Sequence, residues 1–349
     1  MAAAAEIGRG NVNDTFLVTP GDSAAVPFIL QRLNTRVFPE PELVMQNLRV
    51  LTNHVQRQLP KHPHLQVRPW QMPRIIATQD GLDYWIDSEG SFWRALSFIP
   101  ATQSFDTIQS SGHAREVGYA LGIFHLLVSD LPASSLADTL PGFHVTPGYL
   151  RQYDEILEKY PPPPSPEVIY ALEFIKNQRG WAPVLEQARE VGILTARPIH
   201  GDPKINNVLL DNATGQAVSL IDLDTVKPGL VQYDLGDCLR SGCNPSGEET
   251  TDFEPVRFEI DFCRAILQGY LSQARSFLTP GDYDLMYDGI CLITFELGLR
   301  FFTDYLAGNV YFKAAHPAHN LARAVVQFKL TESITAQEAA IKKLIRELQ

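Results

Sequence analysis

Residues Pro198–Asp211 read PIHGDPKINNVLLD, and residues Leu220–Val226 read LIDLDTV. Each segment contains an apolar run, and turn residues separate the two runs, which together predict a short β-hairpin. The hairpin places Asp202 and Asn207 on one side and Asp222 on the other. We therefore expect two carboxylates and one amide to converge in a mostly apolar setting.

Carboxylate and amide oxygen atoms that converge in this way can bind a metal ion or orient a reacting hydroxyl group. Mg²⁺ prefers hard oxygen ligands and keeps part of its water shell, so it suits side chains that meet the phosphates of a nucleoside triphosphate. A further carboxylate can orient a hydroxyl nucleophile. The alternative is an Asx-rich turn inside a core hairpin, which would carry no chemistry.

The combined spacing of these residues resembles a known motif. His200–Asp202 with Asn207 five residues after the aspartate, followed by Ile221–Asp222, is similar to the motif of aminoglycoside phosphotransferases, choline kinases and their relatives in the protein-kinase-like fold. The resemblance implies that Asp202 is the catalytic base and that Asn207 and Asp222 are magnesium ligands. It also implies ATP and Mg²⁺ as the cofactors of a phosphoryl transfer.

The periodicity of the sequence changes along the chain. Residues 1–100 alternate short apolar runs with turn residues and include one helical segment, which predicts a small antiparallel β-sheet lobe. Helical spacing dominates residues 101–349, with long helices expected at 255–277, 280–306 and 318–346. We expect an α+β protein of two lobes. The resemblance assigns nucleotide binding to the first lobe, and catalysis and substrate binding to the second.

The expected nucleotide lobe departs from the usual kinase pattern. Such lobes carry a glycine-rich phosphate loop and a lysine on the third strand, and neither has its standard form here. Gly10, Asn13 and Thr15 occupy a turn and the strand after it, where backbone N–H groups can approach phosphate. At the lysine position, strand alternation turns Gln31 and Arg32 to opposite faces. Charge favours Arg32 as the phosphate contact, whereas alignment favours Gln31.

Two further segments are expected to hold the nucleotide. Lys204, inside the catalytic loop, is a candidate for the missing cation. Phe98 and Ile99 end the last strand of the small lobe, directly before Pro100. By analogy with the fold, backbone groups of this hinge bind adenine. The alternative for the segment is a plain linker between the lobes.

Longer strings extend the resemblance to one subgroup. They are similar to strings of the bacterial N-acetylhexosamine 1-kinases and lie at Val12–Phe16, Leu30–Asn34, His200–Asn207, Ile221–Val226, Asp234–Asp237 and Phe295–Leu306. The resemblance covers nearly the whole chain. It implies ATP-dependent phosphorylation of the anomeric hydroxyl of GlcNAc or GalNAc to a sugar 1-phosphate. The alternatives are the same transfer to another alcohol (choline, homoserine, methylthioribose, an aminoglycoside or another hexose) and a catalytically silent binding protein.

A neutral sugar requires a few hydrogen-bonding side chains and an aromatic surface in a mostly apolar pocket. We expect Arg300, Asp304 and Tyr311 to bind it, with Asp224 as a contact to a sugar hydroxyl or to Arg240. Because Arg300 and Asp304 are four residues apart on a helix, an intrahelical ion pair is the alternative for these two. An arginine in the pocket favours an uncharged sugar over a cationic acceptor.

Four residues outside the motif are expected to have structural roles. Asp234 and Asp237 resemble the acidic residues that brace the catalytic loop in this superfamily. His125 lies in an apolar helical stripe and is expected to be a core histidine. His144 is expected to be an exposed loop residue.

Composition limits the partners and the setting of the chain. Its 349 residues carry a net charge of −11, which disfavours nucleic acid as the main partner because a phosphate backbone attracts basic surfaces. The N-terminus lacks the pattern of a signal peptide, and the longest apolar stretch, Gly118–Leu131, is too short to span a membrane. Four cysteines without a metal-binding spacing fit a reducing cytoplasm. The sequence does not specify the oligomeric state.

Overall fold

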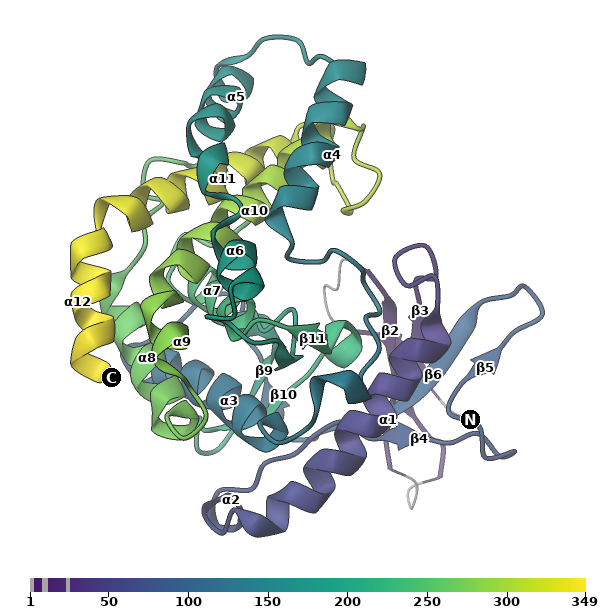
Figure 1. The fold of residues 1–349 in the computed structure, drawn as a ribbon. Helices are drawn as coiled ribbons and strands as arrows, with labels where there is room; N and C mark the ends of the chain where they lie inside the picture. Colours follow the sequence, from purple (N-terminus) through teal and green to yellow (C-terminus); the bar gives the residue numbers. More distant parts are fainter. Residues whose placement is uncertain (1–2, 8–11, 23–25) are drawn as a thin grey trace.

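Six strands of the N-terminal part form one antiparallel sheet (Figure 1). The computed structural model describes residues 3–7, 12–22 and 26–349. Within these residues the sheet order is β1-β2-β3-β6-β4, and β5 pairs with β6. The strands are β1 (Ala3–Glu6), β2 (Asp14–Thr19), β3 (Phe28–Leu33), β4 (Ile75–Ile76), β5 (Trp85–Ile86) and β6 (Phe92–Ser97).

The register of β2, β3 and β6 decides which side chains share a face of the sheet. Thr15 lies opposite Gln31, and Gln31 lies opposite Arg94, so these three side chains point to the same face. Arg32 lies opposite Asp14 and belongs to the other face. Arg94 is only 3% exposed whereas Arg32 is exposed, so the face with Gln31 is turned toward the rest of the protein.

Helices form most of the remaining structure, and α1 (Pro41–Gln58) lies in front of the sheet in Figure 1. Two smaller sheets, β10-β9-β7 and β11-β8, lie among the helices. Their strands are β7 (Thr102–Gln103), β8 (Arg197–Ile199), β9 (Val208–Asp211), β10 (Ala217–Leu220) and β11 (Lys227–Gly229). The other helices are α2 (His64–Val67), α3 (Ser111–Val128), α4 (Thr146–Lys159), α5 (Pro166–Gln178), α6 (Val184–Glu190), α7 (Val231–Gly242), α8 (Ile260–Ala274), α9 (Pro280–Asp284), α10 (Met286–Leu306), α11 (His319–Ala336) and α12 (Glu338–Leu348).

One hydrophobic cluster runs through both parts of the molecule. It contains Leu33 and Phe92 of the sheet, Leu48 of α1, and Leu121 and Leu220 of the helical part. A second cluster holds α4, α5, α6, α10 and α11 together. The expected fold class, a small antiparallel sheet with a larger helical part, is confirmed. A division of the chain near residue 100 stays a prediction, because the first cluster continues across it.

The expected long helices are interrupted or shortened. The segment 280–306 breaks at Leu285 into α9 and α10, and the segment 318–346 breaks at Gln337 into α11 and α12. Gln337 Nε2 donates at 2.8 Å to a carbonyl of the loop before α8, and α12 then packs on α8. Helix α8 begins at Ile260 instead of residue 255, because the residue before it is extended and bonds to the end of α7.

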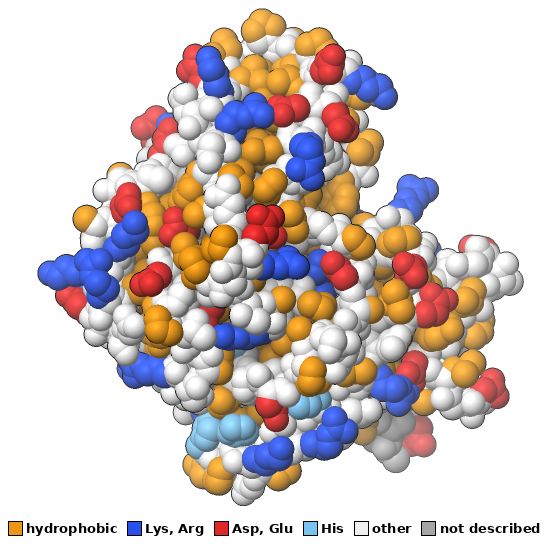
Figure 2. All heavy atoms as spheres, in the orientation of Figure 1, with side chains coloured by type: hydrophobic (Ala, Val, Ile, Leu, Met, Phe, Trp, Pro, Cys, Tyr) orange, Lys and Arg blue, Asp and Glu red, His pale blue; other side chains and the backbone are white. Residues whose placement is uncertain are grey.

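The surface of the molecule carries both signs of charge, and one pair of helices projects from it. On the face shown in Figure 2, acidic and basic side chains are interspersed. Helices α4 and α5 form the arm at the top of Figure 1, and residues 161–165 connect them without helix, as the proline run predicts. Among the described residues, no helix combines the length and the apolar character that crossing a bilayer requires.

Helices α3 and α8 cross at very short range. A Cβ atom on Gly118 would lie 1.9 Å from the carbonyl oxygen of Ile266. A Cβ atom on Gly269 would lie 2.0 Å from the carbonyl oxygen of Arg115. Both helices therefore require glycine at the crossing.

We expect Gly118→Ala to destabilise the protein, because the added methyl group would overlap backbone atoms that move only if the helices separate. The free energy of unfolding should fall by about 1–3 kcal/mol, measured by chemical denaturation. Gly112→Ala on the same helix is the control, because the nearest atom to its Cβ is Ser110 Oγ at 3.6 Å. Equal stability of the two variants would contradict the close crossing.

Candidate active site

The segment between β8 and β9 forms a tight loop that is fixed through its backbone. Gly201 has φ +86°, and a Cβ there would lie 2.6 Å from the carbonyl oxygen of Thr225, so the position requires glycine. The N–H groups of His200 and Gly201 donate to the two carboxylate oxygens of Asp234 at 2.7 and 2.8 Å. Asp234 also contacts the buried ring of His125 at 2.8 Å. Asp234 therefore braces the loop, and His125 is a core histidine that holds the brace, both as predicted.

The ring of His200 connects this loop to the chain that carries Asp222. Its Nδ1 accepts from the N–H of Asp202 at 3.2 Å, so Nε2 carries the proton and donates to the carbonyl of Ile221 at 2.9 Å. Burial lowers the pKa of His200, which keeps the ring neutral and suits this pair of bonds. A buried side chain thus fixes the positions of Asp202 and Asp222 relative to each other.

Asp202 lies next to a lysine of its own loop. Lys204 Nζ is 2.6 Å from Asp202 Oδ2. Burial opposes ionisation of Asp202, but the charges of Lys204 and Arg240 outweigh burial and lower the pKa of this carboxyl. Asn207 Nδ2 donates to the backbone carbonyl of Asp202 at 2.7 Å, and the amide oxygen Oδ1 takes no part in that bond. The structure thus brings these three predicted residues together.

Asp222 forms the other side of the site, in a left-handed backbone conformation with φ 66° and ψ 59°. Burial and then the neighbouring carboxylate of Asp224 raise the pKa of Asp222 to about 7. Asp202 raises that pKa further, whereas Lys204 and Arg94 lower it in part. The ionised form of a buried carboxyl group with acidic neighbours is stabilised by an additional positive charge, which a bound cation supplies.

These side chains fit Mg²⁺ that is shared with phosphate. Among the described residues, no group of three or more His, Cys, Asp or Glu side chains forms a protein cage for a metal. Mg²⁺ does not need such a cage, because it usually binds one or two protein oxygens and completes its shell with phosphate and water. Asp222 and Asn207 Oδ1 supply such a pair, and the excess of negative charge around Asp222 accommodates the ion. Their role as magnesium ligands stays a prediction.

Asp224 points toward the sheet. Its Oδ2 accepts from Asn13 Nδ2 at 2.6 Å, and its Oδ1 forms an ion pair with Arg94 of β6. Gln31 Oε1 in turn accepts from Nε and Nη2 of Arg94 at 3.0 and 2.7 Å. The partner of Asp224 is therefore Arg94 instead of Arg240, while a contact of Asp224 with a sugar hydroxyl stays a prediction.

The other residues predicted to contact the nucleotide differ in their surroundings. Gly10 lies outside the described residues. Thr15 accepts from Gln31 Nε2 at 3.0 Å on the inner face of the sheet. Arg32 Nε donates to Asp14 at 2.9 Å on the exposed face, which disfavours Arg32 as the phosphate contact. Of the two alternatives at the end of β3, Gln31 is the one that faces the site.

Phe98 and Ile99 lie where the chain leaves the sheet. The carbonyl of Ile99 accepts from Thr102 Oγ1 at 2.9 Å. Directly after them, β7 pairs with β9, so the chain enters the helical part at once. The two residues therefore occupy the position expected of a hinge, while their contact with adenine stays a prediction.

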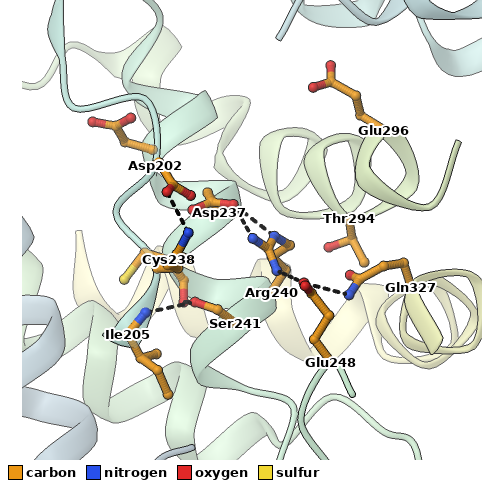
Figure 3. Close-up of polar contacts among 12 residues, drawn as sticks. Asp202, Ile205, Asp237, Cys238, Arg240, Ser241, Glu248, Thr294, Glu296 and Gln327 are labelled. Carbon is orange, nitrogen blue, oxygen red and sulfur yellow. Dashed lines mark hydrogen bonds and ion pairs between the residues drawn. The ribbon is translucent and has the colours of Figure 1, made fainter. Parts of the chain in front are cut away.

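Figure 3 shows a buried network of charges behind the loop. Arg240 contacts Asp237 at 2.7 Å and Glu248 at 3.0 Å. Burial raises the pKa of Asp237, although Arg240 counteracts it. Because Arg240 also lowers the pKa of Asp202, this network contributes to the ionisation of the loop carboxylate.

His144 is a buried support of the catalytic loop, which corrects the expectation of an exposed residue. It is 4% exposed, its Nε2 contacts the carbonyl of Gly201 at 2.8 Å, and its Nδ1 contacts Glu296 at 2.9 Å. Thr146 donates to the second oxygen of Glu296 at 2.7 Å. Burial lowers the pKa of His144, but Glu296 and the Gly201 carbonyl outweigh it and raise this pKa. The ring therefore ties α10 to the loop.

Arg300 of α10 is surrounded by aromatic rings. Its guanidinium carbon lies 5.0–5.8 Å from the ring centres of Phe143, Tyr149, Phe312 and Tyr311. Within the part of the chain that the structure describes, no carboxylate forms an ion pair with it. We call these four rings and Arg300 the arginine cage.

Asp304 does not pair with Arg300, and it faces a loop. Its two oxygens accept from the backbone N–H groups of residues 310–312 at 2.8–3.0 Å and from Asn320 Nδ2 at 3.0 Å. The intrahelical ion pair with Arg300 is therefore wrong, while a contact of Asp304 with the substrate stays a prediction. Asp304 instead shapes the loop that carries two rings of the arginine cage.

A groove of about 860 Å³ lies beside the arginine cage. Its lining comes from the proline run 161–163, the loop 308–317 and Asn34 of the N-terminal part. The loop contributes Tyr311 and Phe312 to both the groove and the cage. The predicted catalytic and metal residues do not line the groove.

The family of the chain follows from comparison with known proteins. The profile of the phosphotransferase enzyme family (APH) matches residues 3–272, which is more than half of the chain. The chain belongs to the phosphotransferase enzyme family. The matched residues include the sheet, the catalytic loop and α7.

Solved structures share the fold of this phosphotransferase at low sequence identity. The microcompartment-associated aminopropanol kinase has a TM-score of 0.62 and 14% identity over 98% of this chain and 94% of that chain. Choline kinase from Cryptosporidium parvum Iowa II has a TM-score of 0.61 and 16% identity over 99% and 93%. Spectinomycin phosphotransferase in complex with ADP and spectinomycin has a TM-score of 0.57 and 13% identity over 97% and 93%. The expected kinase-like fold is confirmed.

The expected class of enzyme is confirmed as well. The family makes the chain a phosphotransferase. Sequence reasoning missed His144, Glu296 and Arg94, which reach the site of the phosphotransferase from distant segments. The signal for Glu296 was its place in an otherwise apolar stretch of helix, because a buried acid requires a partner.

Proposed function

We propose that this phosphotransferase transfers the γ-phosphoryl group of ATP to the anomeric hydroxyl of an N-acetylhexosamine, GlcNAc or GalNAc. The products are the sugar 1-phosphate and ADP. The observation that carries the proposal is the arginine cage. Among the described residues, no carboxylate forms an ion pair with its cation, and Asp202 is one of the charges that act on it. The resemblance of the catalytic loop and of 295–306 to N-acetylhexosamine 1-kinases supports the same acceptor.

The arginine cage disfavours acceptors that carry an amine. The names of two fold neighbours, an aminopropanol kinase and a choline kinase, point to positively charged acceptors. Such an acceptor would meet the guanidinium of Arg300, and like charges repel strongly where water is scarce. A neutral sugar can accept hydrogen bonds from the guanidinium and lie against the rings. The groove beside the cage gives this acceptor access.

Asp202 orients the acceptor hydroxyl for in-line attack. Because its pKa is lowered, Asp202 is a weak base that accepts the proton late, as the bond to phosphorus forms. Lys204 keeps Asp202 ionised. Asn207 and Asp222 would hold Mg²⁺, which neutralises charge on the phosphates when bound. The brace by Asp234 keeps the loop in place for this step.

ATP is the proposed donor, and the hinge at Phe98 and Ile99 is its proposed adenine site. The ADP complex of spectinomycin phosphotransferase supports an adenine nucleotide. Two other fold neighbours are GDP complexes of an aminoglycoside 2'-phosphotransferase, so GTP belongs in the test. The cysteines of this chain are buried and free, which fits a reducing cytoplasmic setting.

The direct test is ³¹P NMR of the purified protein with Mg-ATP or Mg-GTP and one acceptor in each tube. The acceptors are GlcNAc, GalNAc, glucose, galactose, choline, homoserine, methylthioribose and an aminoglycoside. We expect a new sugar phosphate signal coupled to H1 with GlcNAc or GalNAc. Turnover with an amine acceptor alone would keep the enzyme class and refute the proposed acceptor.

The arginine cage allows a prediction about acceptor binding. Arg300→Met should raise the KM for the sugar by about tenfold or more, because it removes a charged hydrogen-bond donor. The KM for ATP should stay within about twofold of the wild-type value, since the cage lies on the acceptor side. Arg264→Met is the control, because Arg264 is about half exposed and forms a surface ion pair with Glu347. An unchanged KM for the sugar in Arg300→Met would contradict the role of the cage.

A further inference from the structure

The lysine that kinase-like lobes carry on the third strand is replaced here by a pair of residues on neighbouring strands. Gln31 of β3 occupies the lysine position and lies directly opposite Arg94 of β6. Gln31 Oε1 accepts from both Nε and Nη2 of Arg94, and Gln31 Nε2 donates to Thr15. A neutral side chain thus holds a cation that reaches the site from the next strand.

The guanidinium of Arg94 is buried with one nitrogen unsatisfied. The Arg94 side chain is 2% exposed and forms an ion pair with Asp224 through Nη2. Its Nη1 is buried and has no hydrogen-bond partner among the described residues. Leaving a buried charged donor unpaired is costly. An oxygen atom of a bound ligand would satisfy this donor.

Arg94 also lies on the side of the site where phosphates are expected. Asp224, its ion-pair partner, is two residues from Asp222, the expected magnesium ligand. Arg94 and Lys204 are both close enough to Asp222 to lower the pKa of its carboxyl group. Arg32 of β3 donates to Asp14 on the opposite face of the sheet.

We propose that Arg94 is the phosphate-binding cation of the nucleotide site and that Gln31 positions it. Arg94 Nη1 donates to a non-bridging oxygen of the α- or β-phosphate, while Gln31 and Asp224 fix the plane of the guanidinium. The proposal rests on the proposed function only in that a nucleoside phosphate occupies this site. Arginine suits the task because its planar fork keeps several donors in fixed directions.

Equilibrium binding of Mg-ADP and of adenosine, by calorimetry, separates a phosphate contact from a structural one. Arg94→Gln should lower the affinity for Mg-ADP by about tenfold or more and leave the affinity for adenosine unchanged. With ATP and the accepted sugar, the KM for ATP should rise in the same proportion. Arg74→Gln is the control, because Arg74 is an exposed cation of the same part of the chain.

A double variant tests whether the cation can be moved from β6 back to β3. Gln31→Lys combined with Arg94→Gln returns the cation to the third strand, with the glutamine now opposite it. We expect this double variant to regain most of the Mg-ADP affinity that Arg94→Gln loses. If Arg94→Gln lowers the affinity for adenosine as much as the affinity for Mg-ADP, Arg94 has only a structural role and the proposal is refuted.

Two outcomes distinguish this proposal from the proposed function. A wild-type protein that binds neither Mg-ADP nor Mg-ATP would refute the proposed function and this inference with it. A wild-type protein that binds Mg-ADP, with an equal affinity in Arg94→Gln, refutes the inference alone. If Arg94→Gln does not fold, Arg94→Met replaces it, because it removes the charge and Nη1 and keeps an unbranched side chain. An unchanged Mg-ADP affinity in Arg94→Met would then refute the proposal.

Discussion

Asp202→Asn is expected to lower kcat by about 10²–10⁴-fold while the binding of sugar and nucleotide stays near the wild-type level. The carboxylate accepts the proton of the attacking hydroxyl, and the amide of asparagine cannot. Lys204 at 2.6 Å holds the carboxylate ionised, so the wild-type group is available as an acceptor at neutral pH. Steady-state kinetics with varied sugar and varied ATP separate the two effects.

Asp80→Asn is the matched control for this exchange, because Asp80 lies exposed in a turn between strands. It should keep the wild-type kcat. Asp202→Asn also removes the ion pair of Lys204, so its folding should be checked by thermal unfolding. A folded Asp202→Asn variant with a kcat near the wild-type value would contradict the assignment of Asp202 as the base.

The sequence predicts which residues form the catalytic loop, because these residues are close together along the chain. Asp202 and Asn207 are five residues apart in one loop, and Asp222 follows the hairpin that continues it. Glycine at 201 is required by a positive φ and a close backbone contact within the same unit. Spacing alone therefore determines which of these side chains meet.

Sequence spacing does not predict the residues that surround the loop. The position of Arg94 depends on the register between β3 and β6, which sequence spacing does not determine. His144 and Glu296 are 152 positions apart and meet only through the packing of α10. The spacing of Arg300 and Asp304 fits an ion pair, but the backbone N–H groups of 310–312 compete for the same carboxylate.

Asp222→Asn is expected to abolish turnover and at the same time to stabilise the protein without metal. Asparagine tolerates the left-handed backbone at this position, so the fold should be kept. The amide is a poorer magnesium ligand, and we expect kcat to fall by about 10²-fold or more, in line with the loss of other electrostatic contacts to a transition state. Mg-ADP should raise the melting temperature of the wild-type protein and raise that of the variant much less.

The gain in stability should depend on pH in a defined direction. The pKa of Asp222 rises from 3.8 to about 7 on folding, so the folded protein retains the proton longer than the unfolded chain. Stability from this group is therefore lost as the pH rises between these two values, and the loss is complete above about 7. The amide side chain of the Asp222→Asn variant stays neutral throughout, so the variant should melt higher than the wild type at about pH 8 and by a smaller margin at about pH 5. A margin that grows as the pH falls would contradict the crowding of acids around Asp222, and with it the reason why this site accommodates a cation.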